Sequence, residues 1–163
     1  MANIDHSMTR RTAVATLCLA LAPTLSLAAG KSAKTPLEVW KDPECGCCKD
    51  WVAQLEANGF AVKVNDTGNT AARGRLGVDR KFGSCHTALV AGYAIEGHVP
   101  AREIRRLLAE KPAAIGLAVA GMPLGSPGMD GPAYGGRKHR YDVLLLSKDG
   151  SAKVYQRYEG SKS

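Results

Sequence analysis

Three of the five cysteines lie close together at Cys45, Cys47 and Cys48, a fourth stands alone at Cys85, and Cys18 lies in the N-terminal stretch that we expect to be removed on export. Apolar residues recur at i, i+3, i+4 and i+7 over residues 48–55, a spacing that predicts one face of a helix. Thiols in the first turn of a helix lie near unpaired backbone N–H groups and the positive end of the helix dipole, which stabilise a thiolate. Thiolates attack disulfides and bind metals, so this segment predicts sulfur chemistry.

Two kinds of sulfur chemistry are consistent with this spacing. Soft thiolate ligands favour Cu(I), Zn(II) or iron–sulfur clusters. Structural zinc usually joins two well-separated C-x-x-C pairs, which the three-plus-one arrangement does not match, so zinc is the less favoured metal. The alternative is a thiol–disulfide oxidoreductase that uses Cys45 and Cys48, which have the C-x-x-C spacing of a redox pair. The two further thiols would invite mixed disulfides, so metal binding is the preferred hypothesis.

Other side chains could assist the cysteines. His86, next to Cys85, could bind a metal or hydrogen-bond to the adjacent sulfur, and we favour the second role. Met122 and Met129 could be weak Cu(I) ligands or apolar plugs. We therefore treat all three as auxiliary candidates beside the four cysteines.

Three aromatic residues, two tryptophans and a histidine, are expected to have structural roles. Trp40 and Trp51 lie on the apolar faces of their predicted elements, which favours a position in the core. His98 precedes the step into a predicted helix, and we expect it to cap that helix or to pack against a loop.

The elements that position these residues follow from hydrophobic alternation and turn signals. We predict strands at 37–40, 60–65, 87–90 and 93–99, and helices at 48–58, 70–78 and 100–111. This order is that of a thioredoxin-like α/β fold, with a βαβ half, a ββα half and a mixed sheet flanked by helices. In such a fold the loop entering the third strand faces the C-x-x-C turn, so Cys85 and His86 should meet the other cysteines in one pocket.

The C-terminal part is predicted to be a long loop followed by a hairpin. Residues 116–141 are rich in glycine and proline and include Met122 and Met129, so we expect an irregular flap over the pocket. The hairpin has strands at 141–146 and 152–158, and it should extend or cover an edge of the sheet. We expect a single domain over residues 36–158, with a frayed end at 159–163.

The first 29 residues have the pattern of an export signal, with Arg10 and Arg11 before an apolar stretch and a small-x-small cleavage site at 26–28. Both the Sec and the twin-arginine routes remain open. Cleavage would leave a periplasmic protein without a transmembrane anchor, which we expect to be a monomer. The formal net charge is +7, but the basic residues are dispersed and lack aromatic interleaving, so no nucleic-acid partner is expected.

Copper fits this setting on three counts: an all-sulfur pocket, thioethers nearby and a compartment in which copper is handled. Four thiolates could share more than one Cu(I), because bridging sulfurs balance the accumulated negative charge. A pocket open to solvent could also cycle between Cu(I) and Cu(II). Whether the protein turns over a substrate stays open.

Four motifs together resemble a known family. Cys-Gly-Cys-Cys at 45–48, Cys-His-Thr at 85–87, Glu-Gly-His-Val-Pro at 96–100 and Gly-Met-Pro-Leu-Gly-Ser-Pro-Gly-Met at 121–129 are similar, in this order, to those of CopG-like copper-resistance proteins. These proteins belong to the bacterial "domain of unknown function 411" group. The resemblance covers roughly residues 36–145.

The resemblance implies a periplasmic, thioredoxin-like, metal-binding protein that serves copper tolerance and could interconvert Cu(I) and Cu(II). Carried over by position, the implied copper ligands are Cys45, Cys47, Cys48 and Cys85. Copper-efflux or copper-chaperone proteins are the partners that such a protein could contact transiently.

Overall fold

The computed structural model describes residues 33–161 of the chain. The predicted export signal at 1–29 lies outside the described residues, as do residues 162–163. Residues 159–161 belong to no strand, and the Ser161 N–H donates to the Lys138 carbonyl at 2.9 Å. Among the described residues, none of the helices has the length and apolar character that a membrane crossing requires.

The described residues form a seven-stranded sheet with three α-helices and two short 3-10 turns. In chain order the elements are β1 (Thr35–Lys41), α1 (Gly46–Ala57), β2 (Phe60–Asn65), α2 (Thr70–Arg75), η1 (Arg80–Phe82), β3 (His86–Val90), β4 (Tyr93–Glu96), α3 (Ala101–Glu110), β5 (Gly116–Ala118), η2 (Pro132–Tyr134), β6 (Tyr141–Leu146) and β7 (Ala152–Tyr158).

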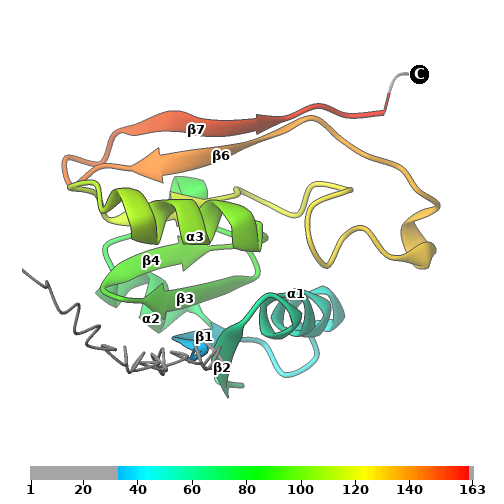
Figure 1. The fold of residues 1–163 in the computed structure, drawn as a ribbon, viewed down its shortest axis with the longest axis horizontal. Coiled ribbons are helices and arrows are strands. Elements are labelled where there is room, and N and C mark those ends of the chain that lie inside the picture. Colours follow the sequence, from blue (N-terminus) through cyan, green and yellow to red (C-terminus); the bar gives the residue numbers. More distant parts are fainter. Residues whose placement is uncertain (1–32, 162–163) are drawn as a thin grey trace, which may run out of the picture. The chain divides into compact units, whose positions relative to one another are not determined.

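The sheet is mixed, as predicted, and has the strand order β2-β1-β3-β4-β5-β6-β7 (Figure 1). β1 runs parallel to β2, and β4 runs parallel to β5, whereas the remaining neighbours are antiparallel. The C-terminal hairpin is confirmed with its predicted bounds, and it extends the sheet so that β7 forms one edge.

Both faces of the sheet carry a hydrophobic cluster. The larger cluster packs side chains of α1 and α3 against the sheet and includes Val39, Trp51, Leu55, Ile95, Ile104, Leu107, Leu117 and Leu145. The smaller cluster contains Val78, Ala94, Ala118 and Leu146. Sequence neighbours such as Ala94 and Ile95 belong to different clusters, because successive side chains of a strand point to opposite faces.

Helix α1 is formed as the sequence predicts. Its buried residues are Cys48, Trp51, Val52 and Leu55, at the i, i+3, i+4 and i+7 spacing of one helical face. The helix ends at Ala57, and Gly59, with φ of 82°, lies just beyond its C-cap, where glycine tolerates the left-handed region without steric cost.

The prediction of an irregular loop over 116–141 is wrong at its start. Residues 116–118 form β5, which fills the place between β4 and β6. Gly116 allows this pairing because a Cβ there would overlap the Ala94 carbonyl. A three-residue strand is too short to show a periodic pattern, and the glycine-rich sequence around it is typical of a loop, so β5 was not predicted.

Smaller differences concern element lengths and one tryptophan. The strand predicted at 93–99 ends at Glu96, and the helix predicted at 70–78 ends at Arg75, near two helix-weakening glycines. Trp51 is fully buried as predicted. The core position predicted for Trp40 is wrong, since its ring is half-buried with the Arg75 guanidinium 4.8 Å from the ring centroid.

Leu117 provides a test of the role of β5 in the core. The side chain is fully buried, so Leu117→Ala should lower the free energy of unfolding by about 2–5 kcal/mol in urea titrations. The control is Val154→Ala at a half-exposed position of β7, which should change the unfolding free energy by no more than about 0.5 kcal/mol. Equal effects of the two substitutions would contradict the placement of β5.

Candidate metal centre

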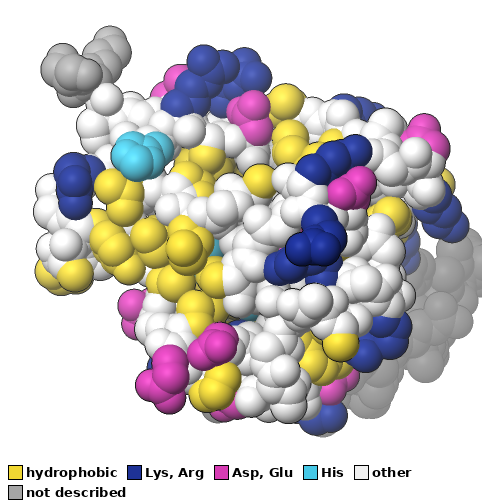
Figure 2. All heavy atoms as spheres, turned by 180° about the vertical axis from the view of Figure 1, so that it is seen from behind, with side chains coloured by type: hydrophobic (Ala, Val, Ile, Leu, Met, Phe, Trp, Pro, Cys, Tyr) yellow, Lys and Arg dark blue, Asp and Glu magenta, His cyan; other side chains and the backbone are white. Residues whose placement is uncertain are grey.

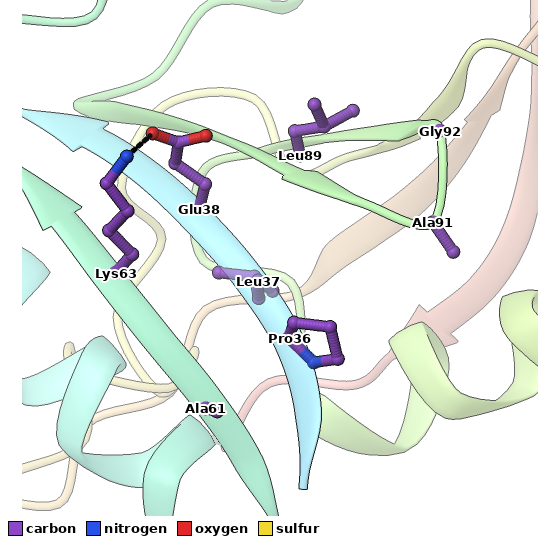
Figure 3. A pocket seen from close by; sticks show the side chains of 8 residues that line it. All are labelled: Pro36, Leu37, Glu38, Ala61, Lys63, Leu89, Ala91 and Gly92. Carbon is purple, nitrogen blue, oxygen red and sulfur yellow. Dashed lines mark ion pairs between the residues drawn. The ribbon is translucent and has the colours of Figure 1, made fainter.

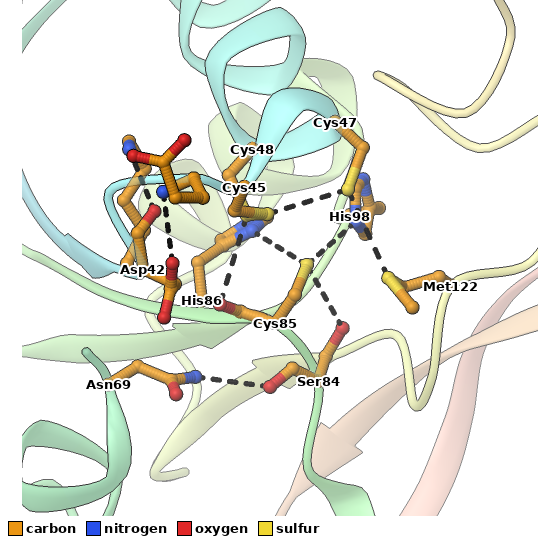
Figure 4. The surroundings of a disulfide bond; sticks show 12 residues. Asp42, Cys45, Cys47, Cys48, Asn69, Ser84, Cys85, His86, His98 and Met122 are labelled. Carbon is orange, nitrogen blue, oxygen red and sulfur yellow. Dashed lines mark hydrogen bonds between the residues drawn. A yellow bond between two sulfur atoms is a disulfide. The ribbon is translucent and has the colours of Figure 1, made fainter. Parts of the chain in front are cut away.

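Two distant segments bring the four cysteines together at one end of the β1–β3 pair. Lys41 at the end of β1 lies opposite His86 at the start of β3, because the two strands are antiparallel. The cysteine-rich turn follows β1, and Cys85 immediately precedes β3. The four Sγ atoms all lie within 4.8 Å of one another (Figure 4), so the sulfurs that the sequence analysis expects in one pocket do gather there.

The sulfurs are not equivalent in this structure. Cys45 and Cys48 form a disulfide with a Cα–Cα distance of 5.3 Å, and Cys47 and Cys85 are free thiols (Figure 4). The Sγ of Cys47 lies 3.5 Å from that of Cys45. Opening the disulfide takes up two electrons and two protons, and it would then offer four thiols in one place.

The cysteine-rich turn forms the N-terminus of α1. Cys45 is the N-cap residue, and its side chain makes no capping hydrogen bond. Cys47 and Cys48 lie in the first turn, which contains no acidic residue. The orphan N–H groups and the positive end of the dipole therefore act on these sulfurs without an opposing charge in that turn.

The environment of Cys85 favours the uncharged thiol over the thiolate. Burial raises its pKa to about 12, and the neighbouring Cys47 adds to this shift. The thiol is therefore protonated at neutral pH, and its Sγ lies 3.0 Å from Nε2 of His98, which can accept the S–H proton. A bound metal cation would reverse this preference, because a coordinating thiol loses its proton.

His98 is the site residue that the sequence analysis misses. Its Nδ1 donates to the Pro127 carbonyl at 2.7 Å, which is the loop packing that we expected. This hydrogen bond places the proton on Nδ1 and leaves the Nε2 lone pair directed at Cys85, and burial lowers the pKa of His98, so the ring is neutral. An imidazole fixed in this way by a carbonyl is arranged as metal-binding histidines are.

A sequence signal for His98 does exist. Thr87 lies opposite Glu96 in the β3–β4 hairpin, and continuing this register by two residues places Cys85 opposite His98. The sequence predicts the turn at Ala91 and Gly92, and counting outward from this turn pairs Cys85 with His98.

His86 is completely buried, and its ring centroid lies 4.2 Å from that of Trp51. Burial lowers its pKa to about 3, and nearby His98 lowers it further, so the ring stays neutral. Its Nδ1 lies 3.4 Å from the Sγ of Cys85, while its Nε2 has no hydrogen-bond partner. Donation from Nδ1 to the sulfur leaves only a lone pair unpartnered, so the geometry favours the hydrogen-bonding role over direct ligation.

The two methionines differ in position. The Sδ of Met122 lies 3.9 Å from the Sγ of Cys47, and the side chain is 52% exposed, so it stands at the mouth of the sulfur cluster. Met129 closes a turn through its backbone, accepting from the Gly125 N–H and donating to the Ser126 carbonyl. Within residues 33–161, no sulfur contact joins Met129 to a cysteine.

The loop between β5 and β6 packs directly on α1. A Cβ at Gly128 would overlap the Cys47 carbonyl, so glycine permits this close approach. Asp130 accepts from the Gln54 side chain at 2.9 Å and from the Gly128 N–H at 3.0 Å, which ties the loop to the helix.

Figure 2 shows hydrophobic side chains gathered on one side of the domain, with Lys and Arg side chains dispersed over the rest of that face.

A hollow of about 490 Å³ opens beside the sulfur cluster. Its lining comprises Arg73, Arg80, Gly83, Ser84, Cys85, Gly121 and Met122. A second hollow, of about 340 Å³, lies over β1 and β2 and is lined by Pro36, Leu37, Glu38, Ala61, Lys63, Leu89, Ala91 and Gly92 (Figure 3). Its polar feature is the Glu38–Lys63 ion pair at 2.8 Å, and none of its eight lining residues carries a sulfur or an imidazole. The hollow with Cys85 is therefore the candidate site.

Comparison with known proteins identifies the family. A family model described as "Protein of unknown function, DUF411" matches residues 82–129. The solved structure named "Copper resistance protein copG- Form 1" is 44% identical, with a TM-score of 0.72 over 78% of this chain and 99% of that one. The chain belongs to the CopG-like DUF411 family. The structure named "Copper resistance protein copG- Form 2" is also 44% identical, with a TM-score of 0.70 over 77% of this chain and 98% of that one. No curated protein matches.

The resemblance inferred from the four motifs is thereby confirmed. The segment that matches the family model contains Cys85, His86, His98 and both auxiliary methionines, whereas the cysteines of α1 lie outside it. Membership of the whole chain in the family therefore rests on the two solved structures, which cover 78% and 77% of it.

The environment of Cys85 predicts an unusual pH dependence of alkylation. In the metal-free protein with its disulfide intact, the iodoacetamide reaction at Cys85 should be slow at pH 7 and should keep accelerating up to about pH 11, because the raised pKa keeps the thiol protonated. Peptide mass spectrometry measures the rate at this residue. A short peptide with the sequence of residues 83–87 is the control, and its rate should level off above about pH 9.5. A Cys85 rate that levels off with the peptide would contradict the account.

Proposed function

We propose that this CopG-like protein binds copper in the periplasm and contributes to copper tolerance, holding Cu(I) between Cys45, Cys47, Cys48 and Cys85 when all four are reduced. The convergence of these sulfurs within 4.8 Å, from two distant segments, carries the proposal. It is supported by 44% identity to structures named as copper resistance proteins.

The donor set suits Cu(I) better than zinc. Thiolates are soft ligands, and imidazole and thioether groups accept copper as well. Three sulfurs from one turn and a single sulfur from another strand do not resemble the paired motifs of structural zinc. Bridging thiolates would allow the pocket to hold more than one Cu(I).

The neighbouring imidazoles support a role for both copper oxidation states. Cys85 belongs to the sulfur group and also to a second group with His86 and His98, whose possible ligand atoms likewise lie within 4.8 Å. An all-sulfur set favours Cu(I), whereas imidazole also suits Cu(II). Oxidation of the Cys45 and Cys48 thiols to the disulfide releases two electrons and two protons, and the electrons can reduce two Cu(II) ions to Cu(I).

Met122 extends this site toward solvent. Its half-exposed thioether, 3.9 Å from Cys47, is placed to pass copper between the cluster and an incoming donor. The proposed donors or acceptors are copper-efflux or copper-chaperone proteins, met transiently by a monomer. Met129 remains a weaker candidate, because its contribution in the described structure is through the backbone.

The thioredoxin-like assignment forms part of this proposal. Its supports are the strand order β2-β1-β3-β4, the parallel β1–β2 pair, and the cysteine turn that leads from β1 into α1. The periplasmic location rests on the export-signal pattern at residues 1–29.

A thiol–disulfide oxidoreductase is the alternative function. The observation that favours it is the Cys45–Cys48 disulfide, which joins the two cysteines of the C-x-x-C spacing. Cys47 weighs against it, because a free thiol 3.5 Å from the Sγ of Cys45 is placed to exchange with the same disulfide.

Cu(I) titration of the reduced mature protein tests the copper hypothesis. The wild-type protein should bind at least one Cu(I) tightly in competition with a colorimetric chelator, and Cys85→Ser should lower the stoichiometry or reduce the affinity by about 10-fold or more. His139→Asn, at an exposed histidine away from the sulfurs, is the control and should behave as wild type. Less than one tightly bound Cu(I) per wild-type chain would refute the hypothesis.

Insulin reduction distinguishes the alternative. A dithiol oxidoreductase that needs only Cys45 and Cys48 should retain its activity when both Cys47→Ser and Cys85→Ser are introduced. The copper hypothesis predicts instead that these substitutions remove metal binding and that insulin reduction is negligible in the wild-type protein.

A further inference from the structure

A buried carboxylate lies directly behind the copper site. Glu96, the last residue of β4, is completely inaccessible to solvent. It accepts hydrogen bonds from Arg73 Nε at 2.9 Å, from the Ser84 N–H at 2.7 Å and from Thr87 Oγ1 at 2.6 Å. Helix α2 and the segment of residues 84–87 therefore converge on this one side chain.

Arg73, from α2, contacts both Glu96 and the segment that carries Cys85. Its side chain is 15% exposed, and its guanidinium pairs with Glu96 and also donates to the Ser84 carbonyl. Asn69 donates to the same carbonyl at 3.1 Å (Figure 4). Both backbone polar groups of Ser84 are thus held by the ion pair: the N–H by the carboxylate and the carbonyl by the guanidinium.

Ser84 is the residue that precedes Cys85, so its backbone sets the direction of the cysteine side chain. Close packing restricts it further, because a Cβ at Gly97 would lie 2.6 Å from the Ser84 Cβ. The Ser84 hydroxyl donates to the Gly121 carbonyl, which links this point to the residue before Met122. The segment that carries the fourth sulfur is therefore fixed on several sides.

An ion pair in this position is an expensive way to stabilise a fold. Desolvation of a buried pair consumes much of its Coulombic gain, and apolar residues of similar volume are often as good for stability. A metal site, in contrast, needs its ligands held to a small fraction of an ångström, and supporting hydrogen bonds provide this. A role of the Arg73–Glu96 pair in orienting Cys85 would explain why its desolvation cost is tolerated.

We propose that Arg73 and Glu96 are positioning residues for copper binding: they hold the Ser84 backbone so that the Cys85 sulfur lies against the other three sulfurs and His98. The proposal concerns the geometry of Cys85 and rests on the proposed copper function only for its metal readout. It also gives a role to the Glu-Gly-His motif, in which Glu96 orients the loop, Gly97 admits it and His98 contacts the sulfur.

The first test needs no copper. In a Cys47→Ser background with the disulfide intact, Cys85 is the only free thiol of the described residues. Glu96→Gln should make alkylation of Cys85 at least about threefold faster at fixed pH, because the loosened loop exposes the sulfur. The matched control is Glu103→Gln: Glu103 is 1% exposed and bonds to Arg102 and Tyr158 at 2.8 Å, with no contact to the Cys85 loop. An unchanged rate in Glu96→Gln, or the same change in Glu103→Gln, would overturn the proposal.

The second test measures Cu(I) affinity of the reduced protein. Glu96→Gln should weaken binding by about 10–100-fold, as loss of a supporting hydrogen bond does at metal sites. In a Cys85→Ser background the same substitution should have no further effect, because the pair acts through that sulfur. An undiminished loss of affinity in that background would refute positioning through Cys85.

Variants with reduced stability do not prevent these tests. Thermal unfolding identifies any variant that fails to fold, and Arg73→Lys, which keeps the charge but loses the guanidinium fork, then replaces Glu96→Gln in both experiments with the same expected directions. Should the wild-type protein bind no copper, the proposed function fails, while the alkylation comparison still decides the positioning of Cys85.

Discussion

The antiparallel pairing of β1 with β3 is the constraint on which the site depends. It places Lys41, at the end of one strand, opposite His86, at the start of the other. The turn into α1 and the loop with Cys85 must then meet at the same end of the sheet. Because β3 also pairs with β4, the same end receives Glu96 and His98. The sulfurs, the imidazoles and the Glu96 carboxylate thus meet at one end of the sheet because of two strand registers, β1–β3 and β3–β4.

Gathering sulfur in this place creates an electrostatic conflict. Cys48 is completely buried, and the pKa of Cys85 is raised to about 12 by burial, with Cys47 adding to the effect. Several thiolates cannot share so dry a space without a compensating cation. A disulfide removes the conflict by oxidation, and Cu(I) removes it by charge neutralisation. The copper and the thiol–disulfide hypotheses therefore describe two solutions to the same physical problem.

The sequence predicted the elements with strong periodicity and missed those defined by tertiary contact. Helix α1 and the β6–β7 hairpin have long apolar patterns, and their predictions hold. Strand β5 is only three residues long, so no periodicity reveals it. Trp40 alternates like a core residue, but its ring is only half-buried, and the side chain that covers it is Arg75, the last residue of α2.

The candidate site likewise contains some features that the sequence predicts and others that depend on tertiary contacts. The meeting of Cys85 with the α1 cysteines follows from topology, and the contact with His98 could have been inferred from the hairpin centre. The Arg73–Glu96 pair could not, because it depends on where α2 docks, and 23 residues separate the partners. Spacing also left open which cysteines pair, since both redox chemistry and metal binding use a C-x-x-C.

Copper location in a crystal of the reduced, Cu(I)-loaded mature protein tests the central claim most directly. Anomalous scattering at the copper edge identifies the metal independently of sulfur. The account predicts copper bound by sulfurs of the α1 turn and by Cys85 Sγ together, with the Cys45–Cys48 disulfide open. Copper bound only away from Cys85, or no ordered copper beside an intact disulfide, would contradict it.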